Sequence, residues 1–416
     1  MTEPVRLALD NGAVLLLRED HGNPSIAIRG SVRAGAAYGA PGVAEFAARL
    51  VFRGTTRRSA SAISDAIESL GAALSSTNAE EAVAIHGRCT RETLKATLKL
   101  LTESLATPAF AEGELEKVRG EVLGDLRAQQ DDTRRAAVRR LAELLYSRGH
   151  AYGRDPKGDE KSVRNVKAKA LRAFHEAYYG AAGMILAFSG DLDAESLGNT
   201  IGPAIEGLDP GSPPKPVPAP KAEKRSSATI PMAHKSQADF VAGRVAVARS
   251  HPDFYALNLA NLLFGRIGLY GRLGTTVRDT LGLAYYSFSS LEARLAGGHW
   301  SLSAGVNPKN LVKAVQAIRA EAERLDKEPF TEQEIRDGKT HLVGALQVNL
   351  ERNPEYAGAL HDVEYHALGS DYLDRYPALV RGIDPDSVRK KAVAYFDPDA
   401  CAWVASGPIG GMKIAF

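Results

Sequence analysis

Histidine is the residue type in this chain best suited to bind a metal ion, and one histidine pair stands out by its spacing. The segment His361-Asp-Val-Glu364-Tyr-His366 places two histidines five residues apart with a glutamate between them. On a helix such residues point about 140° away from each other, so the two imidazoles would diverge. The other eight histidines show no ligand spacing. We therefore expect hydrogen-bonded surface histidines at this segment.

Motifs for nucleophilic or phosphate chemistry are missing as well. No G-x-S-x-G, Walker loop or G-x-G-x-x-G follows a predicted strand, and Gly265-Arg-Ile-Gly268 is expected to be a turn. Cys89 and Cys401 are too few and too far apart to suggest a metal cage or a disulfide framework. The net charge of +2 gives no strong electrostatic reason to bind nucleic acid or an anionic membrane.

The elements that must position any site fall into two halves. The chain has 416 residues, of which 44% are apolar, enough for two or three domains. Six of its 21 prolines lie between Pro210 and Pro220, which favours an extended, semi-rigid spacer. We place a linker at 206–225 and predict domains at 1–205 and 226–416.

The two halves show the same order of elements. In the first half we expect a hairpin turning at Asn11-Gly12, strands near 26–32, 82–86 and 184–188, and helices near 43–52, 61–70, 91–104, 112–147 and 167–179. In the second half we expect strands near 240–247, 283–291, 297–305 and 401–405, and helices near 252–264, 308–325, 331–351 and 385–395. Each half closes on an apolar strand followed by Ser-Gly. This indicates a duplicated α+β unit, with helices packed on one face of a mainly antiparallel sheet.

Targeting and membrane signals are not evident. The start MTEPVRLALDNG lacks the positive end and apolar stretch of a secretory signal, and no run approaches the roughly 18 apolar residues that a spanning helix needs. We expect a cytoplasmic protein without a membrane span. A periplasmic location stays open if the sequence was trimmed.

The segment 34–55, AGAAYGAPGVAEFAARLVFRGT, resembles the signature of the pitrilysin/insulinase-like (inverzincin) zinc peptidases. Those enzymes carry H-x-x-E-H on the helix after a Gly-rich turn, closed by the Phe-x-Gly-Thr pattern that stands here at 52–55. Further segments at 150–158, 179–180, 278–285 and 368–372 resemble the family too. The resemblance spans nearly the whole chain and implies two homologous α+β domains that close like a clam around a peptide chamber.

The family's zinc motif is degenerate in this sequence. In the family, two histidines four residues apart bind zinc, the glutamate before the second one is the general base, and a later acid completes the ligand set. Here Glu45 replaces the first histidine, Ala48 the base and Arg49 the second histidine, while Asp125 stands 76 residues after Arg49, where the third ligand is expected. A guanidinium cannot deprotonate and repels a dication, so we expect no zinc in this chain.

The same residues could instead form an ion-pair cluster. Glu45 and Arg49 stand in the i,i+4 order that favours a salt bridge on a helix, and Arg49 could also reach Asp125. The alternative is that all three are ordinary solvated charges.

A second pair of residues matches the family in the C-terminal half. The family uses an arginine and a tyrosine seven residues apart to hold the substrate backbone and stabilise the oxyanion, and Arg278 and Tyr285 stand at that spacing. Gly282 would allow a sharp turn between them. Tyr286 is the competing choice if the register slips by one. The alternative is a surface arginine and a half-buried strand tyrosine.

The segment 71–86 lies where the family keeps an edge strand that pairs with substrate. Its small residues, including Ala73, Ser75 and Ser76, suit a groove in which a peptide adds to the sheet through backbone hydrogen bonds. They equally suit a plain edge strand protected by the adjacent glutamates Glu80 and Glu81.

Three functions remain from the sequence. The resemblance favours a non-catalytic, substrate-binding subunit of a heterodimeric zinc peptidase, inactive alone, in which Arg278 and Tyr285 reach the zinc of an H-x-x-E-H partner. A catalytically inactive homodimer that binds peptides is the second. A structural subunit, like the core proteins of the respiratory cytochrome bc complex, is the third.

Overall fold

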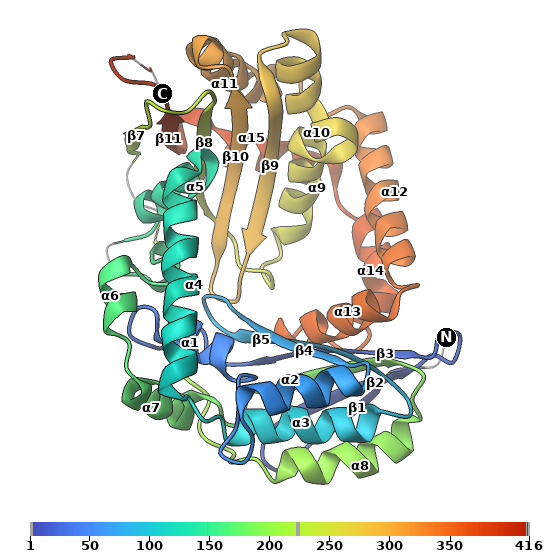
Figure 1. Cartoon of the computed structure of the whole chain (residues 1–416). Helices are drawn as coiled ribbons and strands as arrows, with labels where there is room; N and C mark the ends of the chain where they lie inside the picture. The colour runs from blue at the N-terminus through green and yellow to red at the C-terminus, as the bar shows by residue number, and fades with distance from the viewer. Residues whose placement is uncertain (1–2, 148, 222–224, 413, 415–416) are drawn as a thin grey trace. The chain divides into compact units, whose positions relative to one another are not determined.

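The computed structural model describes residues 3–147, 149–221, 225–412 and 414 (Figure 1). The chain forms two compact units, and each is made of separate stretches of sequence. Unit 1 comprises Met1–Leu126, Asp155–Pro216 and Gln347–Ser370. Unit 2 comprises Arg127–Arg154, Val217–Leu346 and Asp371–Phe416.

Unit 1 is built on a six-stranded sheet in the order β1-β2-β6-β3-β5-β4. Its strands are β1 (Val5–Ala8), β2 (Val14–Glu19), β3 (Ser25–Val32), β4 (Ala73–Asn78), β5 (Val83–Thr90) and β6 (Ile185–Gly190). The β1–β2 pair is the predicted hairpin, and its turn is possible because Gly12 adopts a φ of +88°. All neighbouring strands are antiparallel except β2 and β6.

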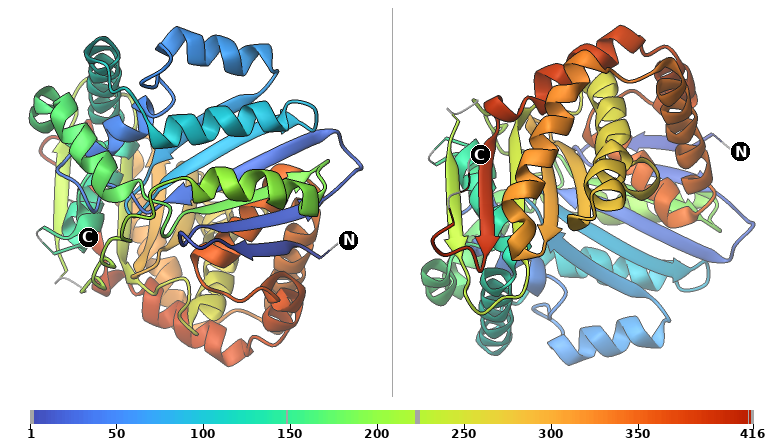
Figure 2. Two further views of the ribbon diagram at one scale, coloured as in Figure 1. Left: turned by 90° about the horizontal axis from the view of Figure 1, so that it is seen from below. Right: turned by 90° about the horizontal axis from the view of Figure 1, so that it is seen from above.

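Helices cover one face of this sheet and form the core of unit 1 with it. They are α1 (Val43–Leu50), α2 (Ala60–Ser69), α3 (Leu94–Ala106), α4 (Glu112–Asp131), α6 (Glu160–Asn165), α7 (Ala168–Tyr178) and α8 (Ala194–Glu206). Figure 2 shows α2, α3 and α8 lying across the strands. Alternate strand residues such as Ile26, Ile28, Val83 and Ile85 point into this core, so the opposite side chains of each strand lie on the second face.

Unit 2 repeats this design with a five-stranded sheet in the order β7-β11-β8-β10-β9. Its strands are β7 (Ser227–Pro231), β8 (Ala238–Ala246), β9 (Ala284–Ala293), β10 (Gly298–Val306) and β11 (Ala402–Gly407). Its helices are α5 (Thr133–Leu145), α9 (Phe254–Gly265), α10 (Ile267–Leu273), α11 (Leu311–Lys327), α12 (Glu332–Asn349, whose end passes into unit 1), α14 (Tyr372–Arg381) and α15 (Pro385–Phe396). A π-helical turn, η2 (Gly274–Thr280), joins α10 to β9. Short 3-10 turns lie at η1 (Ala151–Gly153), η3 (Pro308–Asn310) and η4 (Pro398–Ala400).

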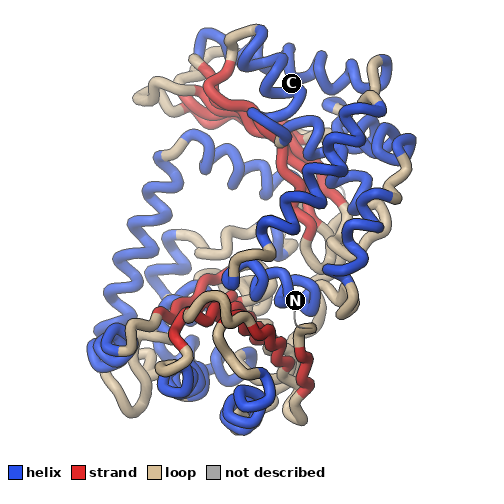
Figure 3. Tube along the Cα trace, turned by 90° about the vertical axis from the view of Figure 1, so that its right-hand side faces the viewer, coloured by secondary structure: helices blue, strands red, loops and turns tan. Residues whose placement is uncertain are grey.

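The two sheets confirm the predicted duplication. The order β2-β6-β3-β5-β4 in unit 1 corresponds strand for strand to β7-β11-β8-β10-β9 in unit 2. In both, the first two strands of that order are the parallel pair, and the other pairs are antiparallel. The predicted α+β class with mainly antiparallel sheets is therefore confirmed. Figure 3 shows the strands (red) gathered together, with helices (blue) packed beside them. By this correspondence β4 and β9 are equivalent edge strands.

Each unit also takes one helix from the other half of the chain. The helix α13 (Asn353–Tyr365) packs on β3 and β6 of unit 1, and α5 packs on β8 and β11 of unit 2. Both lie on the second face of the sheet, away from the main helical layer, which the sequence did not predict. The predicted linker, 206–225, lies between the two sheets along the chain, since β6 ends before it, α8 ends at its first residue, and β7 follows it.

Some predicted element boundaries differ from the structure. The stretch 112–147 is two helices, because Asp132 has extended backbone angles and its side chain caps α5 by accepting a hydrogen bond from the Arg135 N–H. The helix expected from Ser61 begins at Ala60, because Ser59 caps it. The helices α6, α8, α10, α13 and α14 were not predicted. The turn expected at Gly265–Gly268 is wrong, because α9 continues to Gly265 and α10 begins at Ile267. In the described part of the chain, no helix is long and apolar enough to cross a membrane.

Candidate functional site

The helix that carries the degenerate motif, α1, is almost entirely buried. It begins after Gly42, whose φ of +85° directs the chain into the helix, and of its eight residues only Arg49 is not buried. The carboxylate of Glu45 is therefore enclosed, with 6% of the residue exposed. A buried charge of this kind is costly unless an opposite charge and hydrogen bonds compensate it.

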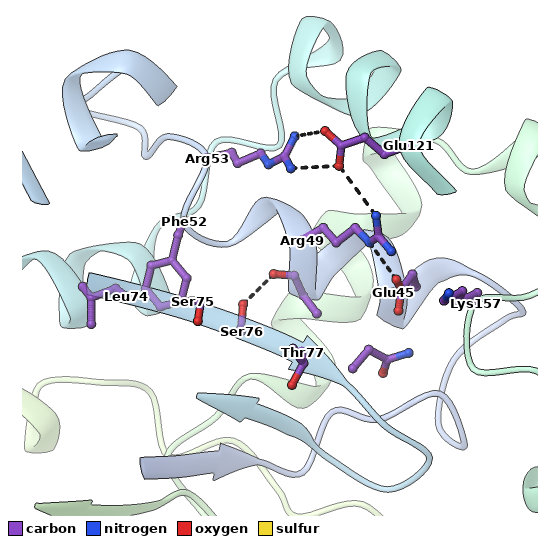
Figure 4. Close-up of a pocket in the computed structure, with 12 residues that line it drawn as sticks. Glu45, Arg49, Phe52, Arg53, Leu74, Ser75, Ser76, Thr77, Glu121 and Lys157 are labelled. Atoms are coloured by element: carbon purple, nitrogen blue, oxygen red, sulfur yellow. Dashed lines mark hydrogen bonds and ion pairs between the residues drawn. The ribbon is translucent and has the colours of Figure 1, made fainter. Parts of the chain in front are cut away.

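Arg49 supplies that compensation and links two helices. Its Nε donates a hydrogen bond to Glu45 Oε1 at 2.7 Å (Figure 4), and its Nη2 donates to Asp125 Oδ2 at 2.5 Å. The hydrogen bond from Arg49 lowers the pKa of Asp125, so this carboxyl group is ionised at neutral pH. The predicted ion-pair cluster is confirmed, and the alternative of separately solvated charges is wrong.

A second row of charges extends the cluster. Arg53, one helical turn beyond Arg49, forms a two-pronged ion pair with Glu121 at 2.8 and 2.9 Å. Glu121 also lies 3.6 Å from Arg49, and Lys157 lies 3.7 Å from Asp125. Three cationic and three acidic side chains thus neutralise one another around α1 and α4. Figure 4 shows the contacts of Arg49 and Arg53 with Glu45 and Glu121.

The residues around α1 do not fit a zinc ion. Zinc sites in proteins are built from imidazole, thiolate and carboxylate ligands around a cation-sized gap. At α1 there is no imidazole, and the guanidinium of Arg49 stands between the carboxylates of Glu45 and Asp125. No cluster of three or more histidine, cysteine or acidic residues suited to a metal occurs among the described residues.

The edge strand β4 lies directly beside α1. Among the described strands it pairs only with β5, which leaves its other edge open. Ser76 turns toward the helix and donates a hydrogen bond to the carbonyl of Ala48 at 2.6 Å. Ala73, Ser75 and Thr77 alternate with it and are exposed on the second face.

The helix α1 and the edge of β4 line an open hollow of about 600 Å³. Its walls are Glu45, Ala48, Arg49, Phe52, Arg53, residues 74–78, Glu121 and Lys157. It therefore brings together most of the residues predicted in this half, while Ala73 lines a neighbouring hollow of about 720 Å³ along the same edge. Asp125, which accepts a hydrogen bond from Arg49, does not line this hollow. Phe52, Arg53 and Glu121 were not predicted as site residues.

Arg278 and Tyr285 lie in unit 2, on either side of a tight turn. Arg278 sits on the π-helical turn η2, a geometry often found at functional sites, and 34% of its side chain is exposed. Gly282 adopts a φ of +59°, which confirms the predicted need for glycine between helix and strand. Tyr285 begins the edge strand β9 and is 58% exposed.

The neighbouring Tyr286 is instead engaged in a hydrogen bond within unit 2. Its hydroxyl donates a hydrogen bond to Asp239, a fully buried carboxylate that also accepts one from Thr133. Burial, together with that carboxylate, raises the pKa of Tyr286. Between the two candidates, Tyr285 is the one whose side chain is open to a ligand.

The two histidines of the divergent motif are also accounted for. His361 lies on α13 and its Nε2 is 2.8 Å from the hydroxyl of Ser31, while its ring stacks on Tyr365. His366 caps the end of the same helix. The hydrogen bond of His361 agrees with the prediction, but its side chain is only 14% exposed, so the expectation of a surface position is wrong for this residue.

Comparison with protein families gives two matches, one in each half of the chain. Residues 14–154 match the family model described as insulinase (peptidase family M16), and residues 165–342 match the one described as the peptidase M16 inactive domain. The chain is 23% identical over 357 residues to an uncharacterized zinc protease of Streptomyces coelicolor, covering 84% of this chain and 77% of that protein. It is 23% identical over 388 residues to the mitochondrial-processing peptidase subunit beta of Mus musculus, covering 88% and 76%.

Solved structures share the fold over the whole length. A peptidase M16 inactive domain from Pseudomonas fluorescens superposes with a TM-score of 0.92 at 23% identity and covers 100% of both chains. A protease from Helicobacter pylori superposes with a TM-score of 0.88 at 20% identity and covers 98% of this chain and 99% of that one.

Proposed function

Since the chain belongs to peptidase family M16, the insulinase-like peptidases, yet carries a guanidinium where the family's zinc would lie, we propose that it is a non-catalytic, peptide-binding subunit that works with a zinc-bearing partner. The observation that carries this proposal is the closed ion-pair cluster around Arg49. Its two hydrogen bonds occupy the carboxylates that could otherwise face a metal. Without zinc-bound water, the chain by itself has no nucleophile for peptide hydrolysis.

Arg278 and Tyr285 in unit 2 give this subunit its share of the catalysis. A zinc peptidase stabilises the developing oxyanion with donors placed beside the metal, and the phenol of Tyr285 is such a donor. The guanidinium of Arg278 can hold substrate carbonyls. We propose that both act on a substrate held at the partner's zinc. One relative is, by its name, a subunit of a processing peptidase, which supports a paired mode of action.

The open edge of β4 serves peptide binding in the same proposal. An extended peptide can add to a free edge through backbone hydrogen bonds, which favours unfolded or short substrates with little sequence preference. The hollow beside β4 offers room for side chains of such a peptide.

A mixing assay tests the proposal. The chain, an H-x-x-E-H protein from the same genome and a quenched peptide are combined singly and together, with zinc measured in each protein. We expect hydrolysis only in the mixture, zinc only in the partner, and about 100-fold or greater loss with Arg278→Ala or Tyr285→Phe. As a matched control, Arg266→Ala removes another exposed arginine of unit 2 and should leave the rate unchanged. Chelator-sensitive hydrolysis by the chain alone, or no rate gain on mixing, would overturn the proposal.

A further inference from the structure

The second face of the unit 1 sheet carries a row of three basic side chains, two arginines and a histidine, next to the open edge. Strand register places Arg29 of β3 directly beside His86 of β5, and His86 directly beside Ser75 of β4. Two residues along, Arg88 of β5 lies beside Ala73 of β4. Because strand side chains alternate between faces, Arg29, His86 and Arg88 all point away from the core.

These charges are not neutralised within the chain. In the described residues, neither Arg29 nor Arg88 has an acidic group within ion-pair distance, and the one side-chain hydrogen bond of Arg29 goes to the carbonyl of Ile28. Burial lowers the pKa of His86, and the electrostatic interactions with Arg29 and His361 lower it further, so the two arginines supply the charge of this row.

The acids that the adjacent helix brings to this face are already engaged. On α13, Glu364 forms a two-pronged pair with Arg6, and Asp362 lies 3.2 Å from His361. The helix covers β3 and β6, which leaves β5 and β4 for a ligand. His86 and Arg88 on β5 therefore stand between α13 and the open edge, and Arg29 lies beside His86 on β3.

The strand at that edge leaves a clear path to the row. Neighbouring strands lie about 4.8 Å apart, so a peptide added to β4 would run about 10 Å from β5. Ala73 and Ser75 lie between them and are small and exposed. A glutamate side chain reaching inward and an arginine reaching outward can span this distance, whereas a large residue on β4 would block it.

We propose that the β4 edge selects extended peptides with carboxylate side chains at alternate positions. These carboxylates would meet Arg88 and the Arg29–His86 pair. The proposal rests on the peptide-binding function proposed above. The spacing follows from the sheet, because every second residue of an added strand faces the same side. Residues between the carboxylates face the hollow at Phe52 and Leu74, where apolar side chains fit. The row of Arg29, His86 and Arg88 thus adds charge selectivity to an interaction that otherwise depends only on the backbone of the peptide.

Fluorescence anisotropy with the full chain tests this selectivity. Three labelled ten-residue peptides carry Glu, Gln or Lys at alternate positions in an otherwise identical sequence. We expect the Glu peptide to bind about tenfold more tightly than the Gln peptide and the Lys peptide to bind weakest, with the difference shrinking as salt rises. Arg88→Gln and Arg29→Gln should each reduce the ratio of Glu-peptide to Gln-peptide affinity, and Arg88→Glu should favour the Lys peptide.

The matched control is Arg172→Gln, which removes an exposed arginine on α7 within the same unit and should leave all three affinities as they are. Equal binding of the Glu and Gln peptides would overturn the inference while supporting a peptide-binding edge. Binding of none of the three would overturn both the inference and the peptide-binding part of the proposed function.

Discussion

Arg49 performs two tasks with one guanidinium. It compensates the buried carboxylate of Glu45, as a metal cation would, and it reaches Asp125 on α4 as a shared metal would. Unlike zinc, it cannot lower the pKa of a bound water or polarise a carbonyl as a Lewis acid. Arg49 therefore cross-links the two helices without offering the chemistry of a metal ion at this position.

Removing this guanidinium should cost stability. We expect Arg49→Ala to lower the free energy of unfolding by about 2–3 kcal/mol, because Glu45 would be left buried without its countercharge. Urea unfolding at neutral pH measures the loss. Arg57→Ala, which removes an exposed arginine, is the control and should change it by less than about 0.5 kcal/mol. The double variant with Glu45→Ala should recover part of the loss, and equal stabilities of all four proteins would contradict the compensating role of Arg49.

The sequence predicted some of the individual residues of the site and missed others. The Glu45–Arg49–Asp125 contacts followed from helical spacing and one family distance. Glu121 was missed although it lies one helical turn before Asp125, because its role depends on how α4 is rotated against α1, which spacing alone does not determine. The choice between Tyr285 and Tyr286 also needed the structure, since it depends on the buried partner Asp239 from another strand.

An ion pair helps to hold the segment that presents Arg278. On α10, directly before η2, Arg272 bonds the carboxylate of Glu334 at 2.8 and 2.7 Å and the carbonyl of Glu328 at 2.9 Å. Glu334 in turn accepts a hydrogen bond from Thr331 at the start of α12. The position of the π-helical turn therefore depends on this contact between α10 and α12.

The contact should make unit 2 sensitive to acid. Burial opposes ionisation of Glu334, but the hydrogen bonds from Arg272 and Thr331 outweigh it and lower its pKa to about 2. Because the folded pKa lies below the unfolded value of about 4.3, the stabilisation is complete above that value and is lost as pH falls toward 2. We expect Glu334→Gln to lower the urea midpoint at pH 6 and to converge with the native chain near pH 2.

A matched substitution separates this effect from general acid sensitivity. Glu323→Gln removes an exposed glutamate of α11 that lies 3.6 Å from Arg319, and its pH curve should follow that of the native chain. A constant offset between Glu334→Gln and the native chain from pH 6 to pH 2 would show that ionisation of Glu334 does not contribute.

Elements with strong periodicity were well predicted. The strands β9 and β10 and the helices α11 and α12 lie within a few residues of their expected ranges, because each combines a clear apolar period with a defined start. The break between α4 and α5 was missed because the apolar period runs through it, and only the Asp132 cap interrupts it. The same break lies close to Arg127, where the chain passes from unit 1 to unit 2.

For the whole molecule, the feature that the sequence predicted least is the placement of two helices: α5 packs on the sheet of unit 2 and α13 packs on the sheet of unit 1. An amphipathic pattern predicts that a helix has an apolar face but not which sheet that face covers. In unit 1, Arg18 stacks on Tyr356 of α13 at 4.2 Å, and Asn353 accepts a hydrogen bond from Arg18 at 3.0 Å. These side chains are buried, so α13 completes unit 1 although it is encoded far from the rest of it.

It follows that the predicted domain 1–205 should not be a complete folding unit. Alone, it lacks α13 over β3 and β6, and it carries α5 without the sheet of unit 2, so apolar residues such as Leu141 and Leu145 of α5 would be exposed. We expect this fragment to bind a hydrophobic dye and to unfold with little cooperativity. Adding a synthetic peptide of residues 347–370 should restore a cooperative transition, because it returns the buried contacts of Tyr356 and Leu360. The same peptide with Leu360→Asp is the control and should fail, since it would bury an unpaired charge. If the fragment instead unfolds cooperatively alone, and the peptide changes nothing, α13 is dispensable for unit 1 and the contiguous halves are the folding units.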